Sequence, residues 1–483
     1  KSGGVNRRSA KMSLLDINHP DIEEFVESKV KEEKKAQTLI QAGYDSSFNG
    51  EAYHTVSLQN CNISVNVTDD FMQRVVDNKP FDLIGRKDGS VVKTVSAKEL
   101  LRRVAESAHM CGDPGIQFED TLNKYHTCVT TDRIRTCNPC SEHVFLDFTA
   151  CNLFSVNVLK FLRDDNTLDL DGFIHTVKIA NLMQEISVDL ASYPTERIAL
   201  ETHNYRPLGV GFTNIGALVM SVGLAYDSAE ARDLVGGLTS LLTASAYVMS
   251  GEVAKVKGVF DGFEKNRTSM REVLTKHADK NDADLINGTS HRYIYRKAYD
   301  LWNRVIAMSY DKGFRNANVS NVAPTGTISF FMDADTTGCE PCLALVAYKL
   351  LAGRGDGMVK VVNNAVNRAL ISMGYDELDR NTIIQYIDTN DTIEGCQTLK
   401  PEHLSVFDCA FKAAKGSRFI HYNGHIDMMA RMIPYLSGAI SKTVNLPESI
   451  TADEIYDIYV SAWKKGLKSI AVYRDNSKGS QPL

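Results

Sequence analysis

The sequence predicts an α/β fold, because short apolar runs typical of strands alternate with amphipathic helices along the chain. The 483 residues are 43% hydrophobic and 24% charged, which is ordinary for a globular protein with a large core. The sequence shows no internal repeat, low-complexity tract or obvious linker. We therefore expect one continuous domain over residues 1–483.

The first third of the chain begins with a helix over residues 20–40, where a weak apolar stripe lies among charged residues. Residues 56–67 alternate as in strands, and Asp69 is placed to cap the helix that follows. Another helix is expected over 97–110, ended by the turn residues 112–115. The apolar run 143–153 looks like a strand.

Helices dominate the rest of the chain. The clearest one begins after Tyr226, where Asp227 and Glu230 have capping-box spacing, and Gly258 ends it. The remaining expected helices cover 172–191, 291–308, 360–373 and 452–466. Strand-like runs at 317–322 and 469–473 lie between helices. The polar stretch 376–397 is expected to extend from the fold at the surface.

Charge and cysteine usage narrow the functional classes. The net charge of −6, with thinly spread Lys and Arg, does not favour a nucleic-acid or membrane-surface partner. The ten cysteines lack the regular spacing of a disulfide scaffold, and no signal peptide or long apolar span is evident. We expect a reducing cytoplasm and no membrane. The chain starts at Lys1 without Met, so we expect it to be part of a longer protein.

The most informative motif is the segment 138–142, Asn-Pro-Cys-Ser-Glu, with Cys151 following eleven positions after Cys140. In an extended loop, side chains two residues apart point the same way, so Asn138, Cys140 and Glu142 would converge. A carboxylate moves protons, and a thiol serves as nucleophile, metal ligand or redox centre. Few reactions need an amide, a carboxylate and two thiols together.

Two glycine-containing segments lead to different predictions about ligand binding. The segment 324–329 (PTGTIS) follows a strand-like run and suits a phosphate, although a plain turn is the better explanation when the segment is taken alone. No Lys follows, so it is not a Walker loop. In 209–216 the third glycine is too far along for a dinucleotide fingerprint, and tight helix packing is the better interpretation.

The cysteine pairs Cys137/Cys140 and Cys339/Cys342 have CxxC spacing. They are much farther apart than the roughly 15–20 residues between pairs in zinc ribbons, so we expect no metal site and keep zinc as a minor alternative. The remaining cysteines outside the motif are most simply small core residues: Cys61, Cys111, Cys128, Cys396 and Cys409.

Taken together, these motifs resemble the class II, adenosylcobalamin-dependent ribonucleotide reductases. The resemblance covers most of the chain in order, at 7–12 (RRSAKM), 19–25 (HPDIEEF), 112–118 (GDPGIQF), 138–142 (NPCSE), 206–209 (RPLG), 323–329 (APTGTIS), 437–443 (SGAISKT), 473–475 (YRD) and 480–483 (SQPL). It implies a ten-stranded α/β barrel, partial at the N-terminus, with a radical cysteine on an internal finger loop.

The resemblance also implies roles for single residues. Cys140 matches the radical cysteine, whose thiyl abstracts the 3′-hydrogen once adenosylcobalamin has taken its hydrogen atom. Glu142 matches the base for the 3′-hydroxyl, Asn138 the group that holds the ribose, and Cys151 one of two cysteines that reduce the 2′ carbon and become a disulfide. Matching the substrate phosphate site are Thr325, Gly326, Thr327, Ile328 and Ser329. Arg7, Arg8 and Ser9 match the loop that couples effector binding to base choice.

The implied activity is reduction of ribonucleoside di- or triphosphates to deoxyribonucleotides for DNA synthesis. The implied partners are dNTP or ATP effectors, a thioredoxin-like or dithiol reductant, and a second copy in a homodimer. The family's first redox cysteine lies upstream of residue 1, and its C-terminal cysteine pair would follow Leu483. We therefore expect a complementary N-terminal fragment and little activity from the isolated chain.

Two alternatives remain open. One is an inactive nucleotide-binding paralogue or a subunit of a split reductase, which the missing upstream cysteine favours and the retained Asn138, Cys140, Glu142 and Cys151 disfavour. The other is a class I-like large subunit that uses a partner's tyrosyl radical.

Overall fold

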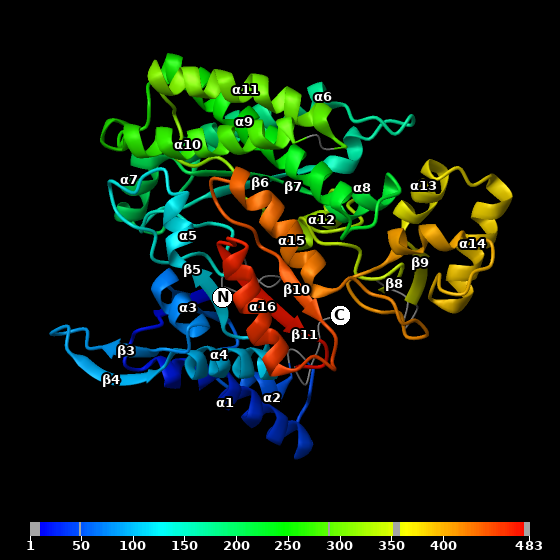
Figure 1. The fold of residues 1–483 in the computed structure, drawn as a ribbon, viewed down its shortest axis with the longest axis horizontal. Helices are drawn as coiled ribbons and strands as arrows, with labels where there is room; N and C mark the ends of the chain where they lie inside the picture. Colours follow the sequence, from blue (N-terminus) through cyan, green and yellow to red (C-terminus); the bar gives the residue numbers. More distant parts are fainter. Residues whose placement is uncertain (1–9, 48–49, 288–289, 351–357, 478–483) are drawn as a thin grey trace. The chain divides into compact units, whose positions relative to one another are not determined.

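The computed structural model describes residues 10–47, 50–287, 290–350 and 358–477. These residues gather into two compact units, both drawn in Figure 1. Unit 1 takes the residues up to His126, residues 133–147 and those from Thr443 onward; unit 2 takes 127–132 and 148–442. The organisation as one domain stays a prediction.

Unit 1 is built on a five-stranded sheet with the order β1–β2–β5–β11–β10. Neighbours in this sheet run parallel, except that β11 is antiparallel to β5. A separate antiparallel hairpin joins β3 to β4. The strands are β1 (Lys11–Asp16), β2 (Cys61–Val67), β3 (Pro80–Ile84), β4 (Val91–Ser96), β5 (Gly115–Phe118), β10 (Thr443–Leu446) and β11 (Ser469–Arg474). The helices are α1 (Ile22–Gln41), α2 (Glu51–His54), α3 (Asp69–Val76), α4 (Ala97–Cys111), α5 (Glu119–Lys124) and α16 (Ala452–Lys464).

Helix α4 shows how local signals and packing agree in unit 1. The Ser96 side chain caps its first turn by accepting a hydrogen bond from the Glu99 N–H at 3.3 Å. Gly112 ends it in the left-handed conformation, with φ of 75°. Helix α4 contacts α1, α3 and α16, so this amphipathic helix packs together with three other helices of the unit.

Unit 2 contains a second parallel arrangement. Strands β6 and β7 pair in parallel, and parallel bridges extend the pair through residues 318–322 to residues 438–441. Its strands are β6 (Asn152–Asn157), β7 (Leu208–Thr213) and the hairpin β8 (Val346–Leu350) and β9 (Met358–Val362). The α-helices are α6 (Leu170–Leu190), α7 (Glu196–Tyr205), α8 (Ile215–Ser221), α9 (Ala229–Lys257), α10 (Phe263–Ile286), α11 (Arg292–Tyr310), α12 (Gly326–Phe331), α13 (Asn364–Ser372), α14 (Glu377–Asn390) and α15 (Tyr422–Met432). The 3-10 helices are η2 (Val158–Phe161), η3 (Pro401–Phe407) and η4 (Ile433–Tyr435).

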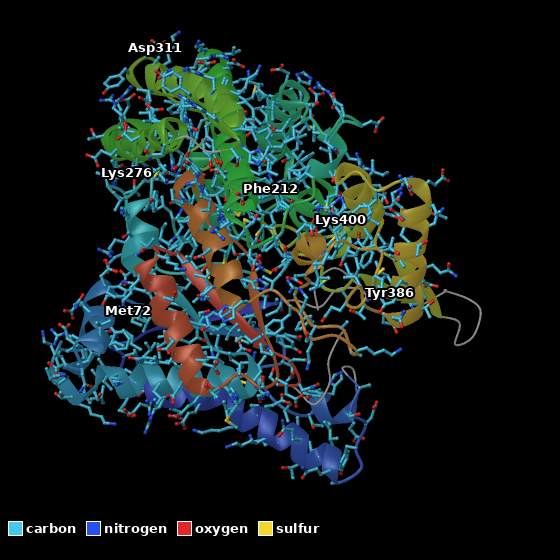
Figure 2. All side chains as sticks on the ribbon, turned by 45° about the vertical axis from the view of Figure 1, so that its right-hand side comes forward. Met72, Phe212, Lys276, Asp311, Tyr386 and Lys400 are labelled. Carbon is cyan, nitrogen blue, oxygen red and sulfur yellow. The ribbon has the colours of Figure 1, made fainter. Side chains whose placement is uncertain are left out.

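The core of unit 2 lies between its sheet and its long helices. Phe212 on β7 is fully buried, whereas Lys276 and Asp311 lie on the outside (Figure 2). Helix α9 packs against α6, α11 and α15. It is long and apolar enough to cross a membrane by length and composition, but 94% of its most apolar window is buried inside the protein. It is therefore explained as a core helix.

Most predicted helices are confirmed, but two of them are capped by other residues than we predicted. The side chain that caps α3 is Thr68 and not Asp69, and the one that caps α9 is Ser228 and not Asp227 with Glu230. The strand expected over 143–153 is mostly wrong, since β6 begins only at Asn152. The polar stretch 376–397 is largely helix α14, and the hairpins β3–β4 and β8–β9 were not predicted.

The α/β class is confirmed, with mixed sheets. Among the strands of the described residues, hydrogen bonds form one five-stranded sheet and three two-stranded ones, besides the isolated bridges. A closed barrel of ten strands is not seen in this part of the chain.

Candidate active site

The segment 137–143 in unit 1 is an irregular loop tied to the five-stranded sheet by two side chains. Asn62 on β2 donates its Nδ2–H to the Pro139 carbonyl at 2.8 Å. Gln117 on β5 donates its Nε2–H to the Ser141 hydroxyl at 3.0 Å and contacts the Cys137 sulfur at 3.2 Å. Since β2 and β5 are neighbours in the sheet, the loop is held at two points by a rigid support.

The loop is a turn and not the extended segment that we expected. Ser141 has a positive φ of 67°, and its N–H donates to the Asn138 carbonyl at 3.0 Å. The alternation argument therefore fails here: the Cys140 side chain is exposed, whereas Glu142 is only 1% exposed. The turn still leaves Asn138 and Glu142 together.

The half-buried Asn138 and the buried Glu142 form an amide–carboxylate pair. The Asn138 side chain hydrogen-bonds to the Glu142 carboxylate, and its Oδ1 accepts from the His143 N–H at 3.0 Å. Burial raises the pKa of Glu142, and the hydrogen bond from Asn138 opposes this only in part. The Glu142 Oε2 atom is buried and has no hydrogen-bond partner within the described residues. One carboxylate oxygen is thus held in place while the other is available to take and return a proton.

Burial also keeps two neighbours of this pair uncharged at neutral pH. It raises the pKa of the Cys137 thiol to about 11 and lowers the pKa of His143 to about 4. Glu142 differs from these two neighbours, because burial raises its pKa from the ordinary value toward neutral pH.

Cys151 lies in unit 2, directly before β6. Its sulfur is 3.9 Å from the Nδ2 atom of Asn321, which belongs to the neighbouring extended segment. A Cβ atom at Gly209 would come within 2.3 Å of the Asn321 side chain, so glycine is required for Asn321 to occupy this place. We had attributed the glycines of 209–216 to helix packing. Gly209 and Gly211 instead make room for a neighbouring segment of the sheet, and only Gly216 lies in a helix.

The segment 325–329 uses its side chains internally and exposes its backbone. The Thr325 hydroxyl accepts from the Gly338 N–H at 2.7 Å, and the Ser329 hydroxyl donates to the Gly326 carbonyl at 2.6 Å. Both residues are buried, whereas Gly326, Thr327 and Ile328 are exposed.

The exposed N–H groups mark the first turn of helix α12. No hydrogen bond to the N–H of Gly326, Thr327 or Ile328 is found in the part of the chain that the structure describes. A Cβ atom at Gly326 would meet nothing within 4 Å, so the space in front of this turn is open. Backbone N–H groups at a helix start suit an anion.

Other predicted groups can now be placed. Arg7, Arg8 and Ser9 lie outside the described residues. The five cysteines predicted as core residues are buried, as are Cys339 and Cys342, whose pKa values burial raises to about 12. Within the described ranges, no group of three or more His, Cys, Asp or Glu side chains is placed to hold a metal ion.

Sequence reasoning missed the residues that position the loops. Gln117 on β5 and Asn321 in a similar extended run are buried polar residues, whereas Asn62 on β2 is exposed. A buried polar residue inside a strand needs a hydrogen-bond partner, which is the signal that could have identified Gln117 and Asn321 but not Asn62.

Comparisons with known proteins agree with these observations. The family model for the ribonucleotide reductase barrel domain matches residues 1–473. A vitamin B12-dependent ribonucleotide reductase of Rhodopirellula baltica is 50% identical over all of this chain, which covers 46% of that relative. The corresponding protein of Streptomyces coelicolor is 44% identical, with 50% of its length covered. A vitamin B12-dependent ribonucleoside-diphosphate reductase of Mycobacterium tuberculosis is 29% identical, with 58% covered.

The chain spans about half the length of the first two relatives. The match of the barrel-domain model to nearly the whole sequence nevertheless leaves no doubt about kinship, and the chain belongs to the ribonucleotide reductase barrel-domain family.

Proposed function

We propose that this chain forms the catalytic part of an adenosylcobalamin-dependent reductase that converts ribonucleotides to 2′-deoxyribonucleotides. The observation that carries the proposal is the buried Glu142 carboxylate, paired with Asn138 and close in sequence to the exposed Cys140 thiol, on a loop fixed to a sheet. The names of the relatives support it. The family's ten-stranded barrel is the fold that we propose for the enzyme, and the parallel strand pairs in each unit support it.

The exposed Cys140 thiol fits the proposed cofactor, because a thiol that is to lose a hydrogen atom must be accessible. When bound, adenosylcobalamin would supply the acceptor for that hydrogen atom. Cys140 is the residue that would face it. Cys140 as a thiyl radical then takes the 3′-hydrogen of the ribose.

Glu142 would accept the proton of the 3′-hydroxyl, since its Oε2 atom has no other partner among the described residues. Asn138 keeps the carboxylate oriented and is suited to contact the ribose. The 2′-hydroxyl leaves as water when it receives a proton from a thiol.

Two thiols supply the two electrons and become a disulfide, while the Cys140 thiol returns the hydrogen atom to the 3′ carbon and Glu142 returns its proton to the 3′ oxygen. Cys151 would be one of them, and the second thiol is not assigned to any described residue. A thioredoxin-like or dithiol reductant would then reduce the disulfide. The need for reduced thiols makes the cytoplasm the location that we propose.

The substrate would be a ribonucleoside di- or triphosphate, bound through the open N–H groups at Gly326, Thr327 and Ile328. Residues Arg7, Arg8 and Ser9 would respond to dNTP or ATP effectors. A homodimer and a complementary N-terminal segment are the further partners that we propose.

Replacement of Cys140 tests the proposal in the full natural protein that contains this chain. Cys140→Ser should reduce deoxynucleotide formation with adenosylcobalamin and dithiothreitol below detection, because a hydroxyl does not carry the radical. Nucleotide binding should persist. Cys137→Ser is the matched control in the same loop and should keep measurable turnover. Product formation by Cys140→Ser at the control's rate would refute the function.

A further inference from the structure

One buried amide of unit 2 is directed at the thiol of Cys151. Asn321 is 0% exposed, and its Nδ2 atom is 3.9 Å from the Cys151 sulfur. No other hydrogen bond of this side chain is found in the described part of the chain, and its Oδ1 atom is buried without a partner there. Leaving half of a buried amide unpaired costs free energy, so the stability of the fold alone does not explain this residue.

The sheet of unit 2 fixes Asn321 at this place. Its backbone N–H donates to the Val210 carbonyl on β7 at 3.2 Å, so the segment 318–322 follows β7. A Cβ atom at Gly209 or Gly211 would come within 2.3 Å of the Asn321 side chain or carbonyl oxygen, respectively. The two glycines therefore let the two segments approach closely, with the amide packed against the backbone of β7.

Cys151 is held in place through its two neighbours in sequence. The Ala150 N–H donates to the Thr202 hydroxyl at 2.9 Å, and the Asn152 carbonyl accepts from the Gln184 side chain at 2.5 Å. Asn152 is also the first residue of β6, which pairs with β7. Both partners of the amide–sulfur contact thus rest on the same pair of strands, so the fold sets the distance between them.

The surroundings of the Cys151 sulfur suit both of its protonation states. As a thiol, it can donate to the Asn152 carbonyl at 3.4 Å. As a thiolate, it can accept from the Asn321 amide, and a hydrogen bond to a charged acceptor is shorter and stronger than one to a neutral acceptor. The Asn321 contact is therefore weak before the proton leaves and strong afterwards, which is the kind of stabilisation that helps a reaction.

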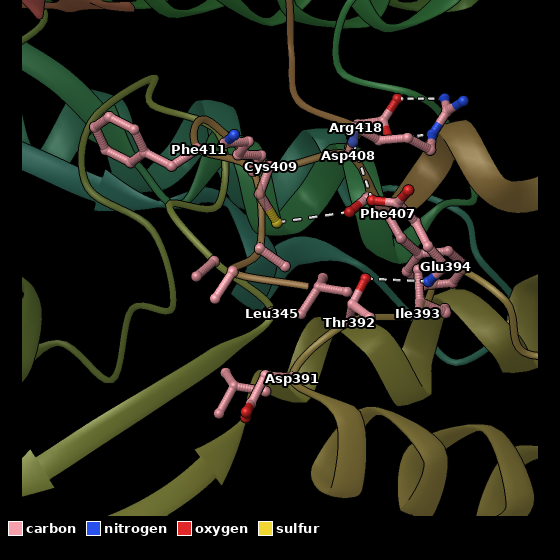
Figure 3. Close-up of a pocket in the computed structure, with 15 residues that line it drawn as sticks. Leu345, Asp391, Thr392, Ile393, Glu394, Phe407, Asp408, Cys409, Phe411 and Arg418 are labelled. Atoms are coloured by element: carbon pink, nitrogen blue, oxygen red, sulfur yellow. Dashed lines mark hydrogen bonds and ion pairs between the residues drawn. The ribbon is translucent and has the colours of Figure 1, made fainter. Parts of the chain in front are cut away.

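Cys409 is a cysteine of unit 2 that lacks such a donor. It is buried, and its thiol donates to the Phe407 carbonyl at 3.5 Å (Figure 3). No N–H donor to its sulfur is found in the described ranges, and burial raises the pKa of this thiol well above its ordinary value. Cys409 therefore stays protonated. Cys151 differs in being half-buried and in having the Asn321 amide beside it.

We propose that Asn321 is a positioning residue for Cys151: its amide N–H holds the sulfur and stabilises the negative charge left when the thiol proton departs. The use of this thiol as a reductant rests on the proposed function. In that reaction one thiol hydrogen leaves in the water formed from the 2′-hydroxyl, the other ends on the 2′ carbon, and the two sulfurs join as a disulfide. Asn321 takes no part in these bonds and acts through the sulfur alone.

The test measures how fast iodoacetamide alkylates Cys151 as a function of pH, in the full natural protein that contains this chain, after reduction with dithiothreitol. Peptide mass spectrometry follows Cys151 separately from the other cysteines. Because the thiolate is the reacting form, Asn321→Leu should move the alkylation profile to higher pH and slow the reaction about threefold or more at about pH 8. The rates should agree within about twofold once the thiol is fully ionised in both proteins. A change in access alone would alter the rate at every pH.

The matched control is Asn318→Leu. Asn318 is a buried asparagine of the same segment that makes no hydrogen bond to a sulfur within the described residues, and its variant should keep the profile of the unmodified protein. Asn321→Ala takes up less room than Asn321→Leu and should give the same shift. Thermal melting checks that each variant folds. In turnover, Asn321→Leu should lower kcat about tenfold and leave the substrate KM within about twofold, because the segment 325–329 is unchanged.

Coincident alkylation profiles for the two Asn321 variants and Asn318→Leu would overturn the inference. Faster alkylation in Asn321→Leu would place the amide oxygen against the sulfur and would overturn it as well, as would a shifted profile with unchanged kcat. Alkylation needs no turnover, so its result is separate from the Cys140→Ser assay, which decides the reductase function.

Discussion

The loop 137–143 and the loop 325–329 are both short and polar, but they are built in opposite ways. In the first, side chains of neighbouring strands hold the Pro139 carbonyl and the Ser141 hydroxyl, the Cys140 side chain is exposed, and one carboxylate oxygen of Glu142 has no partner among the described residues. In the second, the hydroxyls of Thr325 and Ser329 hold the fold, and the backbone N–H groups are left open. Proton and radical transfer need specific side chains, whereas a phosphate is well bound by backbone donors.

The largest effect is expected at Cys151, the thiol that we propose as a reductant in unit 2. Cys151→Ser should reduce normal turnover by about a thousandfold or more, because the 2′ carbon then lacks one of its two reducing thiols. The radical still forms, so the substrate should decompose and release free base, which chromatography detects. Cys396→Ser, at a buried cysteine of the same unit, is the control and should release none. Unchanged turnover by Cys151→Ser would make Cys151 a structural residue.

Glu142→Gln tests whether a side chain carries the chemistry of the first loop. The amide keeps the shape but loses the proton transfer, so kcat should fall by about 10²–10⁴-fold. In the unmodified protein, the base form is present above the pKa of Glu142, which burial raises. The acidic limb of the kcat/KM profile should therefore lie at higher pH than the ordinary value of 4.5 for glutamate and should vanish in the variant. A profile that keeps the same limb in Glu142→Gln would assign it to another group.

The second loop is tested by a pair of substitutions. Gly326→Val should raise the substrate KM about tenfold or more by blocking access to the N–H groups, while a Cβ there meets no protein atom within 4 Å. Thr327→Val removes an exposed hydroxyl but leaves the backbone, so KM should stay within about twofold. The reverse order of effects would show that the hydroxyl, and not the backbone, binds the phosphate.

The smallest effect is expected at the support of the first loop. Asn62→Ala removes the hydrogen bond to the Pro139 carbonyl and should lower the free energy of unfolding by about 0.5–1.5 kcal/mol. A modest fall in kcat should accompany it, because the loop loses one of its two attachments. The control is Gln59→Ala, whose side chain donates one local hydrogen bond, to the Ser57 carbonyl, within the described residues. A variant as stable and active as the control would show that Gln117 alone positions the loop.

The sequence by itself determined most helices and indicated the residues that we propose for the chemistry. The positions of α1, α4, α6, α9, α11 and α16 follow from apolar periodicity and terminal signals, which act within a few residues. Asn138, Cys140, Glu142 and Cys151 were selected as candidates from their types, order and family resemblance, and the comparisons confirm the family.

Only the tertiary structure decided how these residues are presented. The turn at Ser141 forms in a loop whose partners, Asn62 and Gln117, are distant in sequence. Likewise, the Thr325 hydroxyl is taken by Gly338, and Gly209 makes room for Asn321. Hydrogen-bond partners and close approaches of this kind depend on which segments the fold brings together, and no local pattern encodes them.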